Sequence, residues 1–388
     1  KNIAKIKGKM MKEGNDQNSN ISELNVDLLG NIWPGIQLYY PPVKYSPSSG
    51  SYESIEAASM RMKKHAHSTE AHTLIFDLED GCRKKEMSRE LMLNELPLLR
   101  ASRPDVAIAI RVNSFKTDDY ELDMKFIEQV SGCVDAVMLA KAGEVYGASE
   151  IKHLTNHLNK INSSITIQPI IEHPKSLKIA PELMVFDSVK HVVFGIHDFS
   201  KAMGINITPT HWIDELSYFL NELMFEARIS GKGVIGGVET LIGGSSMPSD
   251  FLEQSDVRRW LDLHGDEESR VVYRHAVKER EMGLTGKQVI HPSHIHLCKI
   301  AYTPSPTDIV LKVRILKAAV EADALLGGAI KFNGEMLDPP MFGKALQTLL
   351  RAYALGALKD DDVKFTLSVL NKLPEQIIRQ NWPYGNPS

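Results

Sequence analysis

The chain has 388 residues, which is enough for one large α/β domain with an appendage or for two ordinary domains. Hydrophobic residues make up 43% of it and charged residues 24%, a composition typical of a soluble globular protein. The formal net charge is −4 and both signs are mixed along the sequence, so the charge gives no reason to expect a nucleic-acid or anionic-membrane partner.

The cysteines and the apolar runs indicate a reducing compartment. Cys82, Cys133 and Cys298 lie far apart and form no CxxC pair, which argues against a disulfide framework and against a thiolate zinc site. No apolar run reaches the roughly 18 residues of a membrane span. The lysine-rich N-terminus lacks the apolar stretch of a signal peptide, and we therefore expect a cytoplasmic protein.

Residues 1–30 are polar and show no clear periodicity, and we expect them to form a weakly ordered lead-in. Beyond them, short apolar runs alternate with longer amphipathic segments. The runs expected to form strands are 35–40, 72–77, 106–112, 134–140, 165–171, 191–196, 233–237 and 287–291. Most are continuous rather than alternating, a pattern that favours parallel strands covered on both faces.

Segments of helical length separate these strands; examples are 51–66, 84–100, 120–130, 146–160 and 175–187. Strands alternating with helices over residues 31–300 predict an α/β fold, a (β/α)₈ TIM barrel that forms the catalytic domain. A doubly wound open sheet is the main alternative. No GxGxxG motif follows any of the strands, so the dinucleotide-binding form of that sheet lacks its phosphate loop.

Two regions depart from this rhythm. Residues 238–285 are longer than a usual αβ unit and begin with a stretch rich in Gly, Ser and Pro, which predicts a mobile loop at the barrel mouth. After residue 306 no further strand is expected, and two helical segments are joined by "GAIKFNGEMLDPP". Residues 301–388 are therefore predicted to form a separate C-terminal helical lobe.

Acidic and basic side chains follow most of the predicted strands. In a TIM barrel, functional groups gather at the carboxyl ends of the strands. The residues concerned are Asp77, Glu79, Asp80, Arg111, Asn113, Lys141, Glu172, His173, His197, Asp198 and His291. A structural protein has no need of acids and bases at so many equivalent positions, so we predict an active site at the barrel mouth.

Glu172 and Asp198 close consecutive strands, which lie about 4.8 Å apart in a parallel sheet. Their carboxylates can share one ion, and two carboxylates completed by water and substrate oxygens are the usual way of holding Mg²⁺. As alternatives, Asp198 caps the helix that follows it, and Glu172 is a surface acid before Pro174. Zinc is less suited because too few soft ligands converge there.

Arg111 follows a buried apolar run and needs an anionic partner. At the barrel mouth its guanidinium suits the capture of a carboxylate or a developing enolate. An ion pair with Glu79 or Asp80 is the alternative, and the two roles are compatible. Lys141 would serve as a second cation, as a Schiff-base amine or as an ordinary solvated lysine.

Several segments, taken in chain order, resemble the motifs of the citrate lyase β-subunit family, the HpcH/HpaI aldolase superfamily that includes malyl-CoA and citramalyl-CoA lyases. They are "LIFDLEDGCRKKEMSRE", "IAIRVNS", "AVMLAKAGE", "PIIEHPKSL", "VVFGIHDFSKAMG", "GLTGKQVIHPSHIHLCKIAYTPS" and "FNGEMLDPPMFGKAL". The resemblance covers about residues 70–350.

This resemblance implies a barrel that uses Mg²⁺, or alternatively Mn²⁺, to make or break a carbon–carbon bond next to a carbonyl. It places Glu172 and Asp198 on the metal ligands and Arg111 on the arginine that stabilises the enolate. Glu79 and Asp80 fall on the acids that support the metal waters and the arginine.

Asp338 falls on the lid aspartate of the family, a general acid/base that reaches the active site of a neighbouring subunit in a trimer or hexamer. The resemblance thus implies that the helical region 301–388 acts as a lid and in oligomerisation. Lys141, Asp80 and Asn113 are predicted to lie around the bound cofactor.

One segment departs from the family pattern. After the first strand the family has a PG.RP segment that helps to hold coenzyme A, whereas "YYPPVKYSPSSGSYES" lacks the Gly-Xaa-Arg. Three functions stay open: a Mg²⁺-dependent lyase or aldolase acting on a small β-hydroxy acid or its acyl-CoA thioester, an aldolase acting on a free 2-oxo acid such as pyruvate or oxaloacetate without CoA, and a non-catalytic barrel subunit of a larger complex. The presence of Glu172, Asp198, Arg111 and Asp338 argues against the third.

Overall fold

The computed structural model describes residues 35–47, 49–244, 247, 251 and 253–374. The expected lead-in over residues 1–30 lies outside this part of the chain. Within it, no helix is long and apolar enough to cross a membrane.

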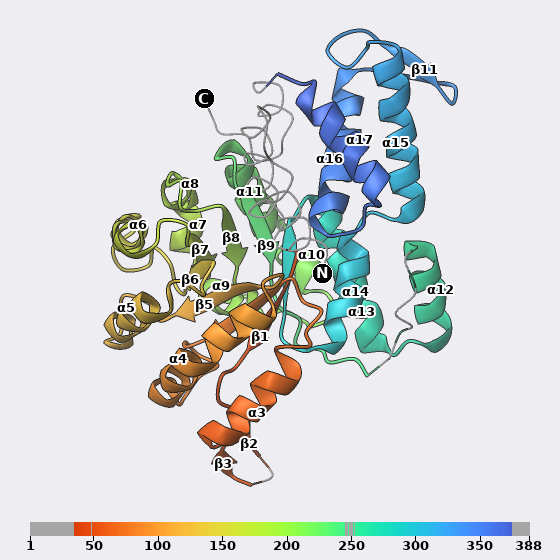
Figure 1. Cartoon of the computed structure of the whole chain (residues 1–388). Coiled ribbons are helices and arrows are strands. Elements are labelled where there is room, and N and C mark those ends of the chain that lie inside the picture. The colour runs from red at the N-terminus through yellow and green to blue at the C-terminus, as the bar shows by residue number, and fades with distance from the viewer. Residues whose placement is uncertain (1–34, 48, 245–246, 248–250, 252, 375–388) are drawn as a thin grey trace.

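Eight parallel strands close into a barrel (Figure 1). They are β1 (Gly35–Tyr40), β4 (Thr73–Asp77), β5 (Ala107–Val112), β6 (Ala136–Leu139), β7 (Thr166–Ile171), β8 (His191–Phe194), β9 (Gly233–Gly236) and β10 (Gly286–Val289). The first strand pairs with the last, since Gly35 lies opposite Gly286 and Gln37 opposite Gln288. The predicted TIM barrel is thus confirmed, and each predicted strand is present with ends shifted by at most two residues.

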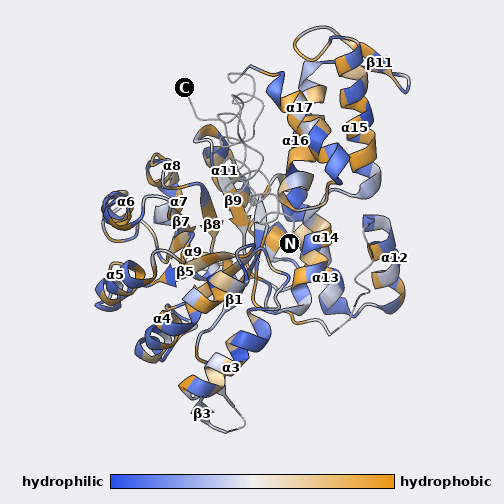
Figure 2. Ribbon diagram, viewed as in Figure 1, coloured by the Kyte–Doolittle hydropathy of each residue, from blue (hydrophilic) through white to orange (hydrophobic). Residues whose placement is uncertain are grey.

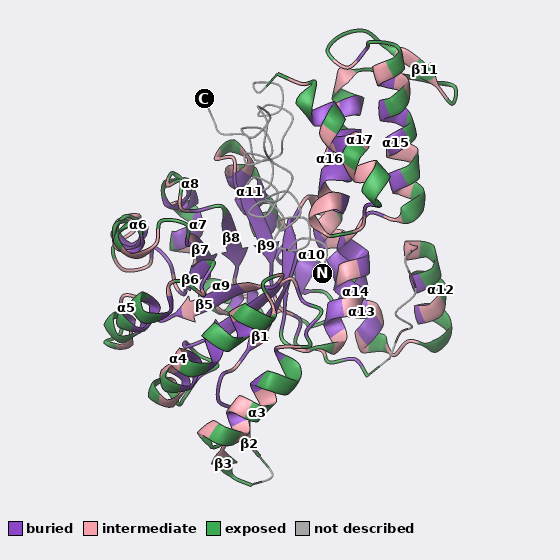
Figure 3. Ribbon diagram, in the orientation of Figure 1, coloured by how far each residue is buried: buried purple, intermediate pink, exposed green. Residues whose placement is uncertain are grey.

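The strands are apolar on both faces because both faces are covered. Alternate residues such as Ile75, Ala109 and Met138 form a small cluster inside the barrel. Their neighbours, such as Leu74 and Ile108, belong to the large cluster under the surrounding helices. Figure 3 shows the barrel strands as buried, and in Figure 2 the outer helices carry both hydrophilic and hydrophobic colours, as amphipathic helices should.

Helices follow the strands around the barrel. They are α3 (Ile55–His65), α4 (Lys85–Ser102), α5 (Asp119–Val130), α6 (Ser149–Ile161), α7 (Pro174–Lys178), α8 (Ala180–Met184), α9 (Ile196–Met203), α10 (Trp212–Glu215), α11 (Ser217–Ile229), α12 (Gln254–His264), α13 (Glu267–Met282) and α14 (Ser293–Tyr302). The region 238–285 therefore holds two helices, α12 and α13, and α13 begins where the side chain of Asp266 accepts from Ser269 N.

The loop between β1 and α3 carries a small hairpin, β2 (Tyr45–Ser46) with β3 (Ser51–Tyr52), where a longer helix was expected. Arg61 holds this loop in place. Its guanidinium donates to both carboxylate oxygens of Glu53 and to the carbonyl oxygens of Pro41 and Pro42.

The C-terminal part contains α15 (Pro306–Glu321), α16 (Pro339–Ala354) and α17 (Asp360–Asn371), which lie beside the barrel in Figure 1. They enclose a hydrophobic cluster of their own, centred on residues such as Leu316, Phe342 and Leu349. The expectation that strands stop after residue 306 is wrong. A hairpin of β11 (Ile330–Phe332) and β12 (Glu335–Leu337) turns through Asn333 and Gly334, whose positive φ angles a tight turn requires.

Candidate active site

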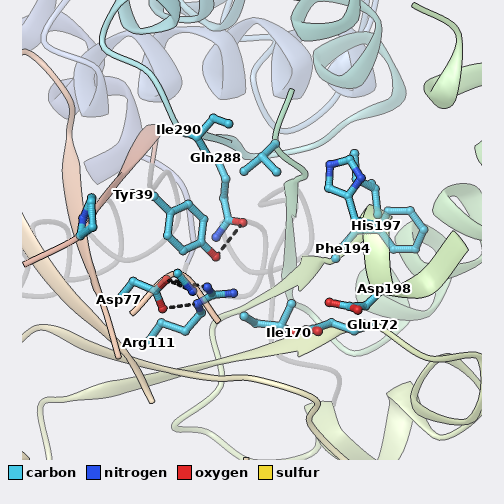
Figure 4. Close-up of a pocket in the computed structure, with 15 residues that line it drawn as sticks. Tyr39, Asp77, Arg111, Ile170, Glu172, Phe194, His197, Asp198, Gln288 and Ile290 are labelled. Carbon is cyan, nitrogen blue, oxygen red and sulfur yellow. Dashed lines mark hydrogen bonds and ion pairs between the residues drawn. The ribbon is translucent and has the colours of Figure 1, made fainter. Parts of the chain in front are cut away.

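A cavity of about 340 Å³ opens among the strand ends of the barrel and the segments that follow them (Figure 4). Its lining residues come from most of the strands. They are Tyr39, Pro41, Asp77, Gly81, Arg111, Ile170, Glu172, Phe194, Gly195, Ile196, His197, Asp198, Val238, Gln288 and Ile290. Arg111, Glu172 and Asp198, which the sequence assigned to different strands, therefore share one cavity.

Asp77 clamps Arg111. The two residues lie opposite each other in the register of β4 and β5, so their side chains emerge on the same face. Asp77 Oδ1 accepts from Arg111 Nε at 2.6 Å, and Asp77 Oδ2 accepts from Nη2 at 2.7 Å. Arg111 Nη1 lies 3.3 Å from Glu79 Oε2. Sequence reasoning expected Glu79 or Asp80 as the partner of Arg111, so the bidentate role of Asp77 was missed.

Burial alone would lower the pKa of the Arg111 guanidinium, but the charges of Tyr39, Asp77 and Glu79 raise it. The guanidinium therefore stays charged. Its carbon lies 4.9 Å from the centre of the Tyr39 ring, which covers it from one side. The arginine is thus held in one orientation with its charge at the cavity wall.

Glu172 and Asp198 lie side by side in Figure 4. Glu172 directly follows β7, whereas Asp198 is the third residue of α9, whose N-cap is Gly195. Asp198 is therefore neither the end of a strand nor a helix cap, and both expectations about its local setting are wrong. Its carboxylate still reaches the cavity, because α9 starts directly after β8.

Glu172 is only 4% exposed, and few hydrogen-bond donors replace the water that its carboxylate loses on burial. Burial raises its pKa to about 8, with Lys141 and Arg111 acting in the opposite direction and Glu79 and Asp198 adding to the rise. The backbone N–H of Lys141 donates to Glu172 Oε1 at 3.3 Å. Such a carboxylate is stabilised by any cation placed beside it.

Lys141 has a positive φ of 53°, a conformation that a residue with a Cβ adopts rarely. This conformation leaves its backbone N–H beside Glu172. Its ammonium group forms an ion pair with Glu79 and lies 3.2 Å from Asp80 Oδ2. Burial would lower the pKa of Lys141, but Glu79 raises it, so the side chain stays charged.

Several of the predicted site residues do not line the cavity themselves. Glu79, Asp80 and Lys141 form the charged layer next to Arg111 and Glu172. Asn113 is buried, and its amide nitrogen donates to Leu78 O at 2.8 Å and to Asp123 Oδ2 at 2.7 Å. The side chain of Asn113 therefore joins β4, β5 and α5 in this structure.

Asp338 is also absent from the cavity lining. It lies between β12 and the first turn of α16 as the N-cap residue of that helix. Figure 1 shows the hairpin of β11 at the far end of the C-terminal helices from the barrel. Asp338 thus does not contribute to the cavity of its own chain.

Tyr39 and Gln288 were missed by sequence reasoning. Tyr39 Oη donates to Gln288 Oε1 at 3.3 Å across the junction of the first and last strands. Alternation could have revealed Tyr39, because inward positions of a strand recur every second residue and Gln37 and Tyr39 are such a pair of polar residues on the first strand.

Within the described part of the chain, no group of three or more His, Cys, Asp or Glu side chains is arranged to hold a metal ion. Glu172 and Asp198 offer two carboxylates, which suits an ion that keeps water and ligand oxygens in its shell.

The chain is similar in sequence to known proteins over most of its length. The citrate lyase subunit β of Haemophilus influenzae is 23% identical over 286 residues, covering 72% of this chain and 88% of the relative. The mitochondrial citramalyl-CoA lyase of Rattus norvegicus is 25% identical over 288 residues, covering 70% of this chain and 76% of the relative.

Solved structures show the same fold. A citrate lyase from Burkholderia xenovorans superimposes with a TM-score of 0.64 at 19% identity, covering 86% of this chain and 96% of that one. Protein CitE from Mycobacterium tuberculosis, in complex with magnesium, acetoacetate and coenzyme A, gives 0.54 at 20% identity, covering 83% of this chain and 99% of that one. Residues 55–257 match the HpcH/HpaI aldolase/citrate lyase family, and the chain belongs to it.

Proposed function

We propose that this member of the HpcH/HpaI aldolase/citrate lyase family is a Mg²⁺-dependent carbon–carbon lyase or aldolase. Its substrate would be a small β-hydroxy acid or the acyl-CoA thioester of one. The observation that carries the proposal is the convergence of Glu172, Asp198 and the clamped Arg111 on one cavity. Neither a binding module nor a scaffold needs a buried, undercompensated carboxylate beside a guanidinium.

The residues present fit a divalent cation. Glu172 is buried with its pKa raised to about 8, and the charge of Asp198 adds to that rise. A cation shared by the two carboxylates would relieve both the burial and the repulsion. When bound, Mg²⁺ would polarise substrate oxygens and serve as a template for the substrate. The relative from Mycobacterium tuberculosis was solved with magnesium, which supports this choice of ion.

Arg111 would stabilise negative charge that develops on the substrate. Asp77 holds the guanidinium through two hydrogen bonds, so no rearrangement is needed when that charge appears. Glu79, Asp80 and Lys141 would keep the surrounding charges in place, with Lys141 balancing the two acids. We keep Asn113 only as a positioning residue, because its amide nitrogen donates to Leu78 and Asp123 and its amide oxygen accepts from Lys85.

Asp338 is our candidate for the general acid/base. Because it does not line its own cavity, it would act on the cavity of a neighbouring subunit in a homo-oligomer. A side chain delivered by a neighbour can close the cavity and exclude water before the proton moves.

A free 2-oxo acid is the second candidate substrate, and the loop after β1 favours it. Arg61, the arginine in this region, is engaged with Glu53 and with the carbonyl oxygens of Pro41 and Pro42. It is therefore not presented to the phosphates of coenzyme A.

Titration calorimetry with Mg²⁺ on the full chain tests the proposal. The unmodified protein should bind one ion, and Glu172→Gln or Asp198→Asn should weaken that binding by roughly a hundredfold or more. Glu90→Gln, on the exposed side of α4, is the matched control. Equal Mg²⁺ affinity in all four proteins would end the proposal. A panel of acyl-CoAs and 2-oxo acids, followed by mass spectrometry, then separates the two substrate classes.

A further inference from the structure

The charges around the cavity limit what it can hold. Its lining contains three carboxylates, Asp77, Glu172 and Asp198, and a single guanidinium, Arg111, for a formal charge of −2. One divalent cation makes the lining neutral. With the cation and a ligand of one carboxylate bound, the formal charge in the cavity is then −1, and with a ligand of two carboxylates it is −2.

Apart from Arg111 and the imidazole of His197, the lining offers no basic side chain for a second carboxylate. The other side chains, the three carboxylates aside, are apolar or polar and uncharged: Pro41, Ile170, Phe194, Ile196, Val238, Ile290, Tyr39 and Gln288. In Figure 4, Tyr39, Gln288 and Ile290 lie away from the pair formed by Glu172 and Asp198. A carboxylate that moves from water to such a wall loses its hydration without gaining a partner.

The hydroxyl group of Tyr39 is committed as a donor. Gln288 turns its amide nitrogen toward two acceptors, Gln37 Oε1 at 3.5 Å and Met138 Sδ at 4.0 Å. Its carbonyl oxygen is therefore left for Tyr39, whose hydroxyl donates to it at 3.3 Å. Gln37 in turn donates to Gln168 Oε1 at 3.4 Å, which orients the whole row of amides.

Tyr39 lines the cavity, and because its proton is used for Gln288, its phenolic oxygen is left as an acceptor. It can accept a hydrogen bond from a neutral ligand, but its lone pairs repel a carboxylate. Branched apolar side chains usually fill a barrel at this level, so a row of three glutamines under a tyrosine is an unusual arrangement. Of this row, Tyr39 and Gln288 line the cavity, where they present uncharged polar groups.

We propose that the cavity selects a 2-oxo acid with one carboxylate and a short apolar substituent, and that Tyr39 determines this specificity by rejecting a second carboxylate. The inference rests on the proposed function, whose substrate class it narrows. A free monocarboxylic 2-oxo acid is the partner, product or substrate, in the carbon–carbon bond reaction.

Calorimetric titration of the full chain in saturating Mg²⁺ tests this inference with two ligands of equal chain length, 2-oxopentanoate and 2-oxoglutarate. They differ in a terminal methyl group against a terminal carboxylate. We expect 2-oxopentanoate to bind at least roughly tenfold more tightly. Tyr39→Phe keeps the ring over Arg111 and removes the oxygen, so the preference should fall by roughly threefold or more. Tyr45→Phe, on the exposed hairpin, is the matched control and should keep the full preference.

Each outcome is decisive. Equal or tighter binding of 2-oxoglutarate overturns the inference while the proposed Mg²⁺ site stands. Mg²⁺ binding without binding of either 2-oxo acid also overturns it. Loss of Mg²⁺ binding itself would remove the proposed function and the inference together. A preference that survives Tyr39→Phe unchanged would refute the role of Tyr39.

Discussion

At the scale of single residues, Gly195 makes room for Glu172. Ile171 and Phe194 are partners in the register of β7 and β8, so the next residues on the two strands, Glu172 and Gly195, come into contact. A Cβ on Gly195 would lie 2.5 Å from Glu172 Cγ and 3.1 Å from Ile170 Cγ2. The backbone of Gly195 has an ordinary negative φ, so the need for glycine here is purely a need for space.

Gly195→Ala should therefore displace the Glu172 side chain. We expect a loss of about 1–3 kcal/mol in the free energy of unfolding and at least a roughly tenfold loss in Mg²⁺ affinity by calorimetry. Gly132→Ala, where a Cβ would meet nothing within 4 Å, serves as the control. Unchanged Mg²⁺ affinity in Gly195→Ala would show that Glu172 does not hold the ion.

At the scale of elements, a buried lysine ties β10, α13 and the end of β9 together behind the cavity wall. Lys287 is 0% exposed, and its Nζ lies 2.8 Å from Glu279 Oε2, 3.0 Å from Glu239 Oε1 and 3.0 Å from Gly237 O. Glu239 also accepts from Trp212 Nε1 at 2.8 Å. The neighbours of these residues in the sequence, Val238 and Gln288, line the cavity, so this network positions one of its walls.

Lys287→Met would leave the two glutamates buried without their cation. We expect a loss of about 3–5 kcal/mol in the free energy of unfolding, measured by urea denaturation. Adding Glu279→Gln to Lys287→Met should restore part of it, because one of the uncompensated charges is then gone. Lys331→Met, on the exposed face of β11, should change little. A stable Lys287→Met protein would contradict this account of the network.

Glu279 makes stability depend on pH. Burial raises its pKa to about 7 and Glu239 adds to the rise, while Lys287 opposes both. The folded state binds the Glu279 proton more tightly than the unfolded state does. The favourable contribution of this proton to the free energy of unfolding is therefore fully present below about pH 4.5 and is lost as the pH rises through about 7. Between about pH 5 and about pH 8, titration of Glu279 should lower the free energy of unfolding by about 2 kcal/mol.

Glu279→Gln should flatten that dependence. Urea denaturation of both proteins at about pH 5 and about pH 8 measures it. Glu239, whose pKa falls to about 2 because Lys287 and its hydrogen bonds outweigh burial, acts in a lower pH range and does not interfere. An identical pH dependence in the two proteins would show that Glu279 is ionised throughout.

At the scale of the whole molecule, the cavity and Asp338 are separated. The barrel provides Arg111, Glu172 and Asp198, whereas Asp338 begins α16 in the C-terminal part, with Met336 (62% exposed) and Met341 (45% exposed) beside it. Exposed methionines around a polar residue at the junction of β12 and α16 are suited to contact with another copy of the chain. The division into a barrel and a C-terminal lobe that acts as a lid remains our proposal.

Complementation between two variants tests whether subunits share a site. Glu172→Gln and Asp338→Asn should each be inactive on the substrate found in the panel. Co-expression should restore about a quarter of the activity, because one site in four then combines an intact Glu172 with an intact Asp338 from its neighbour. If co-purified mixed oligomers recover no activity, Asp338 does not act in the active site of a neighbouring subunit.

The sequence by itself determined the order of the strands and the edge at which function gathers. Continuous apolar runs bounded by polar residues are typical of covered parallel strands. Eight such runs alternating with helices, without a GxGxxG motif, favoured a barrel over an open sheet, and with the barrel came the shared position of Arg111, Glu172 and Asp198. The ends of elements were predicted less well from the sequence. Asp198 was expected at the end of a strand but lies in α9, and the hairpin of β11 and β12 was not expected.

Only the tertiary structure decided which side chains meet. Asp77 rather than Asp80 holds Arg111 because the register of β4 and β5 sets them face to face. Tyr39 meets Gln288 across 249 residues because closure of the barrel brings the first strand beside the last. Pairing between strands depends on register and closure, which are properties of the whole chain and leave no signal in a short stretch of sequence.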